Sequence, residues 1–154
     1  GDEYFVASLE PSTGTPHVVY SYTYSRGMYM DCADPNGRCW CDLFPCYAGP
    51  SYCTRPQHLP TVEQAGVVTG RWTCLEQMID AGTPVRGAAD ADGVLDFWID
   101  EVEIGPWDDL WWRTVPTLQV NFLWLYLYHH AEHSVEGLEV DNVVVSTARI
   151  GCGR

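Results

Sequence analysis

The sequence predicts an all-β protein, an antiparallel β-sandwich or jelly roll that forms one domain over residues 1–154. Three observations support this prediction. Apolar and polar residues alternate with a period of two in several segments, which is typical of half-buried strands. Helical periodicity is scarce, and short turn signals separate the alternating segments, as in sandwiches and jelly rolls. A chain of 154 residues is also long enough to bury one core of its own.

The alternating segments and the turns between them define the expected strands in chain order. A turn at STGT separates the first two strands, and the Asp92–Gly93 pair is a turn signal before a later one. Residues 31–66, rich in Cys, Pro and Gly, form an irregular insertion that needs disulfides to hold its shape. We expect strands at 3–11, 17–25, 70–79, 94–104, 110–114, 118–128 and 138–150, with a turn at 105–109.

The charge of the chain excludes two classes of partner. There are 21 acidic residues against 8 basic ones, all of them arginine, and the formal net charge is −13. Nucleic acids and anionic membrane surfaces require clustered cations, so neither is expected to bind. The longest apolar run, residues 122–128, is far shorter than the roughly 20 residues that cross a bilayer, so no membrane span is expected.

Seven cysteines indicate disulfides and an oxidising, extracellular location. Their spacing lacks the paired C-x-x-C units of a zinc ribbon. Because the number is odd, at least one thiol is free or paired with another chain, and the connectivity stays open. The cysteines are Cys32, Cys39, Cys41, Cys46, Cys53, Cys74 and Cys152.

The predicted strands place aliphatic residues on one face and aromatic or acidic residues on the other. In 118–128, Leu123, Leu125 and Leu127 share the first face, while Phe122, Trp124, Tyr126 and Tyr128 share the second. In 94–104, Leu95, Phe97 and Ile99 are expected in the core, with Asp96, Trp98 and Asp100 facing outward. In 70–79, Leu75 and Ile79 face the core and Trp72, Glu76 and Met78 face outward. In 17–25, Tyr20, Tyr22 and Tyr24 share one face.

An open face of Trp and Tyr interspersed with carboxylates suits a carbohydrate. The flat CH face of a sugar ring packs on an aromatic ring, while its hydroxyl groups find polar partners. The alternative is that a second layer covers this face and makes an ordinary core. The candidate carbohydrate-binding residues are Trp72, Glu76, Asp96, Trp98, Trp124, Tyr126 and Tyr128, with His129 as a polar contact or proton carrier at the end of the groove.

Two short motifs suggest metal ions. Asp90 and Asp92 offer oxygen ligands of the kind that calcium prefers, although a plain turn is the alternative. Calcium is therefore the candidate cofactor. His129 and His133 have a spacing that could hold zinc on a helix, but they follow a strand closely and favour a solvated loop.

The blocks GRWTCLEQMI, DGVLDFWIDEVEIG, WWR and LEVDNVVVSTARIGC resemble polysaccharide lyases of the alginate- and glucuronan-lyase-like type, which have a concanavalin-like jelly roll. The resemblance covers about residues 66–152 and, more weakly, 3–24. It implies that Tyr20 and Tyr22 are the acid and base of a β-elimination. It also implies that further N-terminal strands are missing here or supplied by another chain or fragment. The chain departs from the family pattern because it has no lysine and carries Glu101 in place of a glycine.

These observations predict an extracellular polysaccharide-binding protein that holds a glycan in an aromatic and acidic groove. One alternative is an active polysaccharide lyase that uses the tyrosine pair. Another is a structural subunit of an extracellular fibre or coat, because an open jelly roll leaves sheet edges that can self-assemble or pair with a missing fragment.

Overall fold

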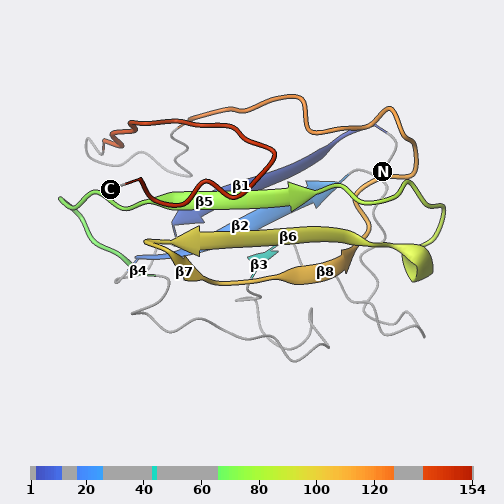
Figure 1. Ribbon diagram of the computed structural model, residues 1–154, viewed down its shortest axis with the longest axis horizontal. Coiled ribbons are helices and arrows are strands. Elements are labelled where there is room, and N and C mark those ends of the chain that lie inside the picture. The colour runs from blue at the N-terminus through green and yellow to red at the C-terminus, as the bar shows by residue number, and fades with distance from the viewer. Residues whose placement is uncertain (1–2, 12–16, 26–42, 45–65, 127–136, 154) are drawn as a thin grey trace, which may run out of the picture.

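The computed structural model describes residues 3–11, 17–25, 43–44, 66–126 and 137–153 (Figure 1). Apart from η1 (Ala88–Asp90), a single 3₁₀ turn, all regular structure in these ranges is β, and every strand pair is antiparallel. The prediction of an all-β antiparallel protein is confirmed. Within the described residues, a search for a helix with the length and hydropathy of a membrane span finds none.

The first sheet is built on one long hairpin. β1 pairs with β2 in register from Phe5 opposite Ser25 to Pro11 opposite Val19, which confirms the two N-terminal strands that alternation predicted. Two short strands pair with the other edge of β2. The strands are β1 (Phe5–Pro11), β2 (His17–Ser25), β3 (Leu43–Phe44) and β4 (Gly66–Val67).

The second sheet is centred on β6, which pairs with β5 on one edge and with β7 and β8 on the other. The predicted strand 94–104 is interrupted at Asp100 and Glu101, whose φ angles of 47° and 72° turn the chain back on itself. The turn expected at 105–109 instead contains most of β8, and the strand expected at 110–114 ends at its first residue. The strands are β5 (Leu75–Asp80), β6 (Gly93–Ile99), β7 (Val102–Glu103) and β8 (Trp107–Leu110).

The two sheets pack face to face, with the second sheet in front of the first in Figure 1. Val19 of β2 packs against Phe97 and Ile99 of β6, and Leu95 packs with Leu110 and Trp112. The predicted core face of β6, formed by Leu95, Phe97 and Ile99, is thereby confirmed. Each such side chain contributes roughly 1.5–3 kcal/mol by its burial. One polar contact also joins the sheets, because Gln77 Nε2 donates to Ser21 Oγ at 2.9 Å.

The two strands predicted nearest the C-terminus are wrong for the described residues. Residues 118–126 and 137–150 form no strand, and apart from the half-buried Leu118 their large apolar side chains are exposed. In Figure 1 both segments run above β5 as extended coil. Alternation makes a segment able to form a strand, but a strand also needs a hydrogen-bonded neighbour. No such neighbour is present among the described residues.

Candidate functional site

Tyr20 and Tyr22 lie on the outer face of the first sheet. Val19, Ser21 and Thr23 of the same strand are buried toward the second sheet, so the alternation of β2 turns the two tyrosines the other way. The register places Glu10 opposite Tyr20 and Ser8 opposite Tyr22. The side chain of Tyr24 lies outside the described residues.

Hydrogen bonds link these four residues, which we call the tyrosine cluster: Ser8, Glu10, Tyr20 and Tyr22. The Tyr20 hydroxyl donates to Glu10 Oε2 at 3.3 Å, and Ser8 Oγ donates to Glu10 Oε1 at 2.7 Å. Burial raises the pKa of Tyr20, and the charge and hydrogen bond of Glu10 raise it further. Tyr20 is therefore a protonated donor at neutral pH and is a poor general base.

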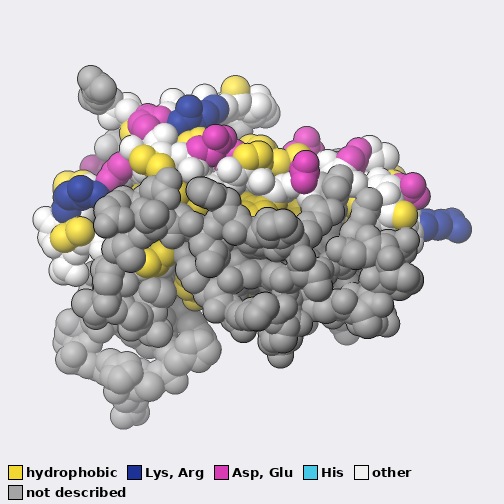
Figure 2. Space-filling model, turned by 90° about the horizontal axis from the view of Figure 1, so that it is seen from below, with side chains coloured by type: hydrophobic (Ala, Val, Ile, Leu, Met, Phe, Trp, Pro, Cys, Tyr) yellow, Lys and Arg dark blue, Asp and Glu magenta, His cyan; other side chains and the backbone are white. Residues whose placement is uncertain are grey.

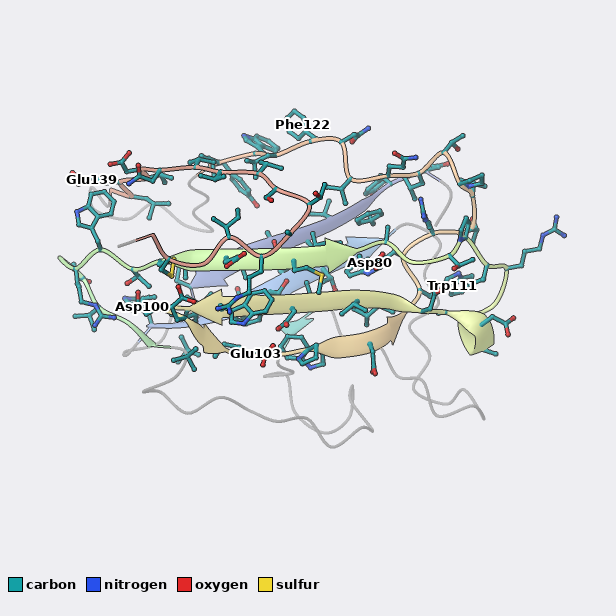
Figure 3. All side chains as sticks on the ribbon, viewed as in Figure 1. Asp80, Asp100, Glu103, Trp111, Phe122 and Glu139 are labelled. Carbon is teal, nitrogen blue, oxygen red and sulfur yellow. A yellow bond between two sulfur atoms is a disulfide. The ribbon has the colours of Figure 1, made fainter. Side chains whose placement is uncertain are left out.

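Tyr126 lies within electrostatic range of Tyr20, because it contributes to the raised pKa of that phenol. Its ring centroid is 4.9 Å from that of Trp124, and Phe122 meets Trp124 edge to face at 6.4 Å. Trp124 is 68% exposed and Tyr126 47% exposed. We call Phe122, Trp124 and Tyr126 the aromatic row; Figure 3 shows Phe122 at the outer edge of the molecule.

The leucines beside the aromatic row do not fill the core as predicted. Leu123 and Leu125 are more than half exposed, like the aromatic residues that flank them. The segment is therefore open on both sides, because it is not held in a sheet that would cover one of them. Among the described ranges, the aromatic row is nevertheless the longest run of exposed rings.

The predicted site on the second sheet is closed. Glu76 and Trp98 are register partners on its outer face, but Trp98 is only 8% exposed. The guanidinium of Arg149 lies 4.8 Å from the Trp98 ring centroid, and the Glu76 carboxylate accepts hydrogen bonds from the amides of residues 150 and 151. The prediction that Trp98 faces solvent is wrong, because the C-terminal segment covers it.

Asp96 is also buried, with 3% of its surface exposed, so the prediction that it faces outward is wrong. Its Oδ1 has no hydrogen-bond partner. Burial raises the pKa of Asp96 to about 6, and the neighbouring Glu103 carboxyl raises it through a hydrogen bond and through its charge. A buried carboxyl of this kind is not available to a glycan.

Trp72 is 65% exposed but belongs to a different part of the molecule. It lies on the loop before β5, next to Arg71, whose Nη2 is 2.6 Å from Asp100 Oδ2 in the β6–β7 turn. It is therefore attached to the second sheet, whereas the tyrosine cluster lies on the first. Figure 2 shows that acidic and hydrophobic side chains are intermixed along the described edge of the molecule.

Of the two aspartates proposed for calcium, Asp92 forms hydrogen bonds within the chain and Asp90 is exposed. Asp92 accepts hydrogen bonds from the Thr83 amide at 2.5 Å and from its hydroxyl at 2.6 Å, and these bonds lower the pKa of Asp92. Asp90 is exposed in η1. No group of three or more His, Cys, Asp or Glu side chains in the described ranges could hold a metal ion.

The prediction of disulfides is confirmed for one pair, which the spacing had left open: Cys74 and Cys152 are bonded across a sequence separation of 78. The remaining cysteines lie outside the described residues, as do Tyr128, His129 and His133. Sequence reasoning missed Glu10 and Arg149. Glu10 could have been found by closing the predicted hairpin, which sets it opposite Tyr20. No local signal indicated where Arg149 would lie.

Comparison of the chain with protein-family models, with curated proteins and with solved structures finds no match.

Proposed function

We propose that this protein binds a polysaccharide along the aromatic row and the tyrosine cluster. The observation that carries the proposal is the exposed pair Trp124 and Tyr126, whose ring centroids are 4.9 Å apart, next to the hydrogen-bonded Glu10 and Tyr20. The rings offer stacking surfaces to sugar CH groups. The carboxylate and phenol offer an acceptor and a donor to sugar hydroxyls.

The charge of this surface favours a neutral or amino sugar. After burial, the strongest influence on Tyr20 is the negative charge of Glu10, which raises the pKa of that phenol. A uronate carboxylate would be repelled by the same charge, in a chain whose net charge is −13. The site therefore suits chains of neutral hexoses or of partly deacetylated amino sugars.

The same groups support binding without cleavage. β-Elimination needs a deprotonated base and a cation that neutralises the uronate carboxylate. Tyr20 holds its proton more firmly than an ordinary tyrosine. The lyase-like jelly roll and the acid–base role of Tyr20 and Tyr22, which the family resemblance implies, stay predictions.

The test is a binding panel of neutral, amino-sugar and uronate polysaccharides, followed by tryptophan fluorescence. Trp124→Ala is expected to weaken binding about tenfold, because one stacked ring contributes roughly 1–2 kcal/mol including its burial. Trp72→Ala is the matched control, since Trp72 and Trp124 are 65% and 68% exposed. Equal losses in both variants, or no binding to any glycan, would contradict the proposal.

The same panel tests cleavage through the absorbance of the unsaturated product. We expect no elimination by the wild-type chain with any uronate. Elimination that disappears in Tyr20→Phe would replace binding with the lyase alternative.

A second candidate function is extracellular assembly through residues 118–126 and 137–145. Large apolar side chains are exposed in both segments, and contiguous exposed apolar surface marks interfaces. Extended segments that form no strand can also accept a strand from a second copy or from a fragment that supplies missing strands. Val144→Asp would then abolish concentration-dependent association in sedimentation experiments while glycan binding persists. Sedimentation as a monomer at all concentrations would exclude this candidate.

A further inference from the structure

The C-terminal strap, residues 149–152, is bound by side chains of the second sheet. The Arg149 guanidinium lies over Trp98, with 4.8 Å to the ring centroid. Its Nη2 is 2.6 Å from Glu101 Oε2, and its Nε is 3.8 Å from Glu76 Oε2. An aromatic face flanked by two carboxylates is a site that selects a cation.

The backbone of the strap is recognised as well. The amides of Ile150 and Gly151 donate to the two oxygens of Glu76 at 2.6 and 3.0 Å, and the Cys152 amide donates to Glu101. Gly151 has a φ of 72°, and a β-carbon there would lie 3.1 Å from Glu101 Oε1, so a glycine is favoured at this position. The disulfide from Cys152 to Cys74 completes the contact.

The residues before the strap contribute far less to its attachment. Residues 137–148 form no strand, and the apolar side chains among them, such as Val145 at 79%, are exposed. The strap is thus a short, self-contained ligand at the end of a segment that the sheets do not incorporate. Because Arg149 and Glu101 are each about half exposed, their ion pair is screened by solvent, and the disulfide is the firm part of the attachment.

We propose that the strap is exchangeable between copies of the protein, so that the strap of one copy fills the Trp98 site of another and forms the Cys152–Cys74 disulfide between chains. Exchange preserves every contact of the strap and changes only which chain supplies it, as in domain swapping. The chain's own strap competes for the Trp98 site at an effective concentration set by the segment that tethers it. The fraction of exchanged straps therefore rises with protein concentration. The proposal is independent of glycan binding and does not use residues 118–145.

Two full-length variants test the exchange. Cys74→Ser retains the cysteine of the strap, and Cys152→Ser retains the cysteine of the site, so neither can form this disulfide within its own chain. In a mixture with oxidised glutathione, the two thiols lose their hydrogens to the glutathione disulfide, which becomes two glutathione thiols. We expect a cross-linked dimer in which mass spectrometry of proteolytic fragments identifies Cys152 of one variant bonded to Cys74 of the other.

Recognition is separated from chance collision by adding Arg149→Ala to the chain that retains Cys152. We expect this change to slow formation of the specific cross-link at least several-fold, whereas a random thiol encounter would be indifferent to Arg149. An equal rate with and without Arg149, or the absence of the Cys152–Cys74 cross-link, would overturn the proposal.

The wild-type chain gives an independent measurement that does not depend on how the variants fold. Isotopically heavy and light chains are mixed at high concentration in a glutathione redox buffer, where reduced glutathione opens the disulfide and lets it close again. Exchange predicts Cys74–Cys152 fragments that combine one heavy and one light partner, and more of them at higher protein concentration. Only heavy–heavy and light–light fragments at every concentration would refute the exchange.

Discussion

Asp96 makes the stability of this protein depend on pH in a direction opposite to that of most carboxylates. Its side chain is buried, its Oδ1 has no hydrogen-bond partner, and it contacts the carboxyl of Glu103. Burial, followed by the hydrogen bond and charge of Glu103, raises its pKa to about 6. The folded chain therefore holds this proton more tightly than the unfolded chain does.

The size of this effect on stability follows from the difference in the pKa of Asp96 between the folded and the unfolded chain. A pKa of about 6 in the folded chain against the ordinary 3.8 corresponds to about 3 kcal/mol of unfolding free energy. The protonated Asp96 carboxyl makes its full contribution to stability below pH 4. It is lost progressively as pH rises from about 4 to about 6, because the carboxyl must then ionise in a buried place.

Asp96→Asn removes this dependence, because asparagine keeps the size of the side chain and cannot ionise. We expect the variant to be about 1–3 kcal/mol more stable than wild type at pH 7.5 and to lose most of that advantage at pH 4. The measurement is urea unfolding at both pH values, followed by tryptophan fluorescence. Asp90→Asn, at an exposed position in η1, is the control and should leave the difference between the two pH values unchanged.

A difference between Asp96→Asn and wild type that is the same at pH 4 and pH 7.5 would refute this reasoning. It would mean that Asp96 does not change its proton affinity on folding. A variant that is less stable at pH 7.5 would show that the ionised carboxylate is stabilised where it lies.

Two further changes test how the second sheet is held. Replacing both Cys74 and Cys152 by serine should lower the free energy of unfolding by about 4 kcal/mol, the chain-entropy value for a 78-residue separation. A loss below about 1 kcal/mol in urea unfolding would contradict this expectation. Arg113→Lys should lower the free energy of unfolding by about 1–3 kcal/mol. The guanidinium donates to the Gly82 carbonyl from two nitrogens and to the Leu118 carbonyl from a third, and an ammonium group cannot reproduce this arrangement. Arg86→Lys, at an exposed position, is the control. Equal melting temperatures for the two variants would show that the hydrogen bonds of the Arg113 guanidinium do not stabilise the fold.

The parts of the fold that could be predicted are those decided within one strand. Alternation alone placed Leu95, Phe97 and Ile99 in the core, and it turned Tyr20 and Tyr22 to the opposite face from the buried Val19. The closure of Trp98 could not be predicted in this way. Arg149 covers it from fifty-one positions further along the chain, close to a disulfide whose pairing the spacing of seven cysteines left open.

The error at residues 118–126 has a different cause and bears on function. The segment has the alternation of a strand, but backbone pairing is a property of two segments, and the described part of the chain supplies no partner for it. Exposed rings therefore lie in a segment that forms no strand, at Phe122, Trp124 and Tyr126. A glycan would use the rings and leave the backbone as it is, whereas an added strand would use the backbone. Amide hydrogen exchange of these residues therefore separates the two functions: slowing on self-association indicates strand pairing, and unchanged exchange with a saturating glycan indicates ring stacking.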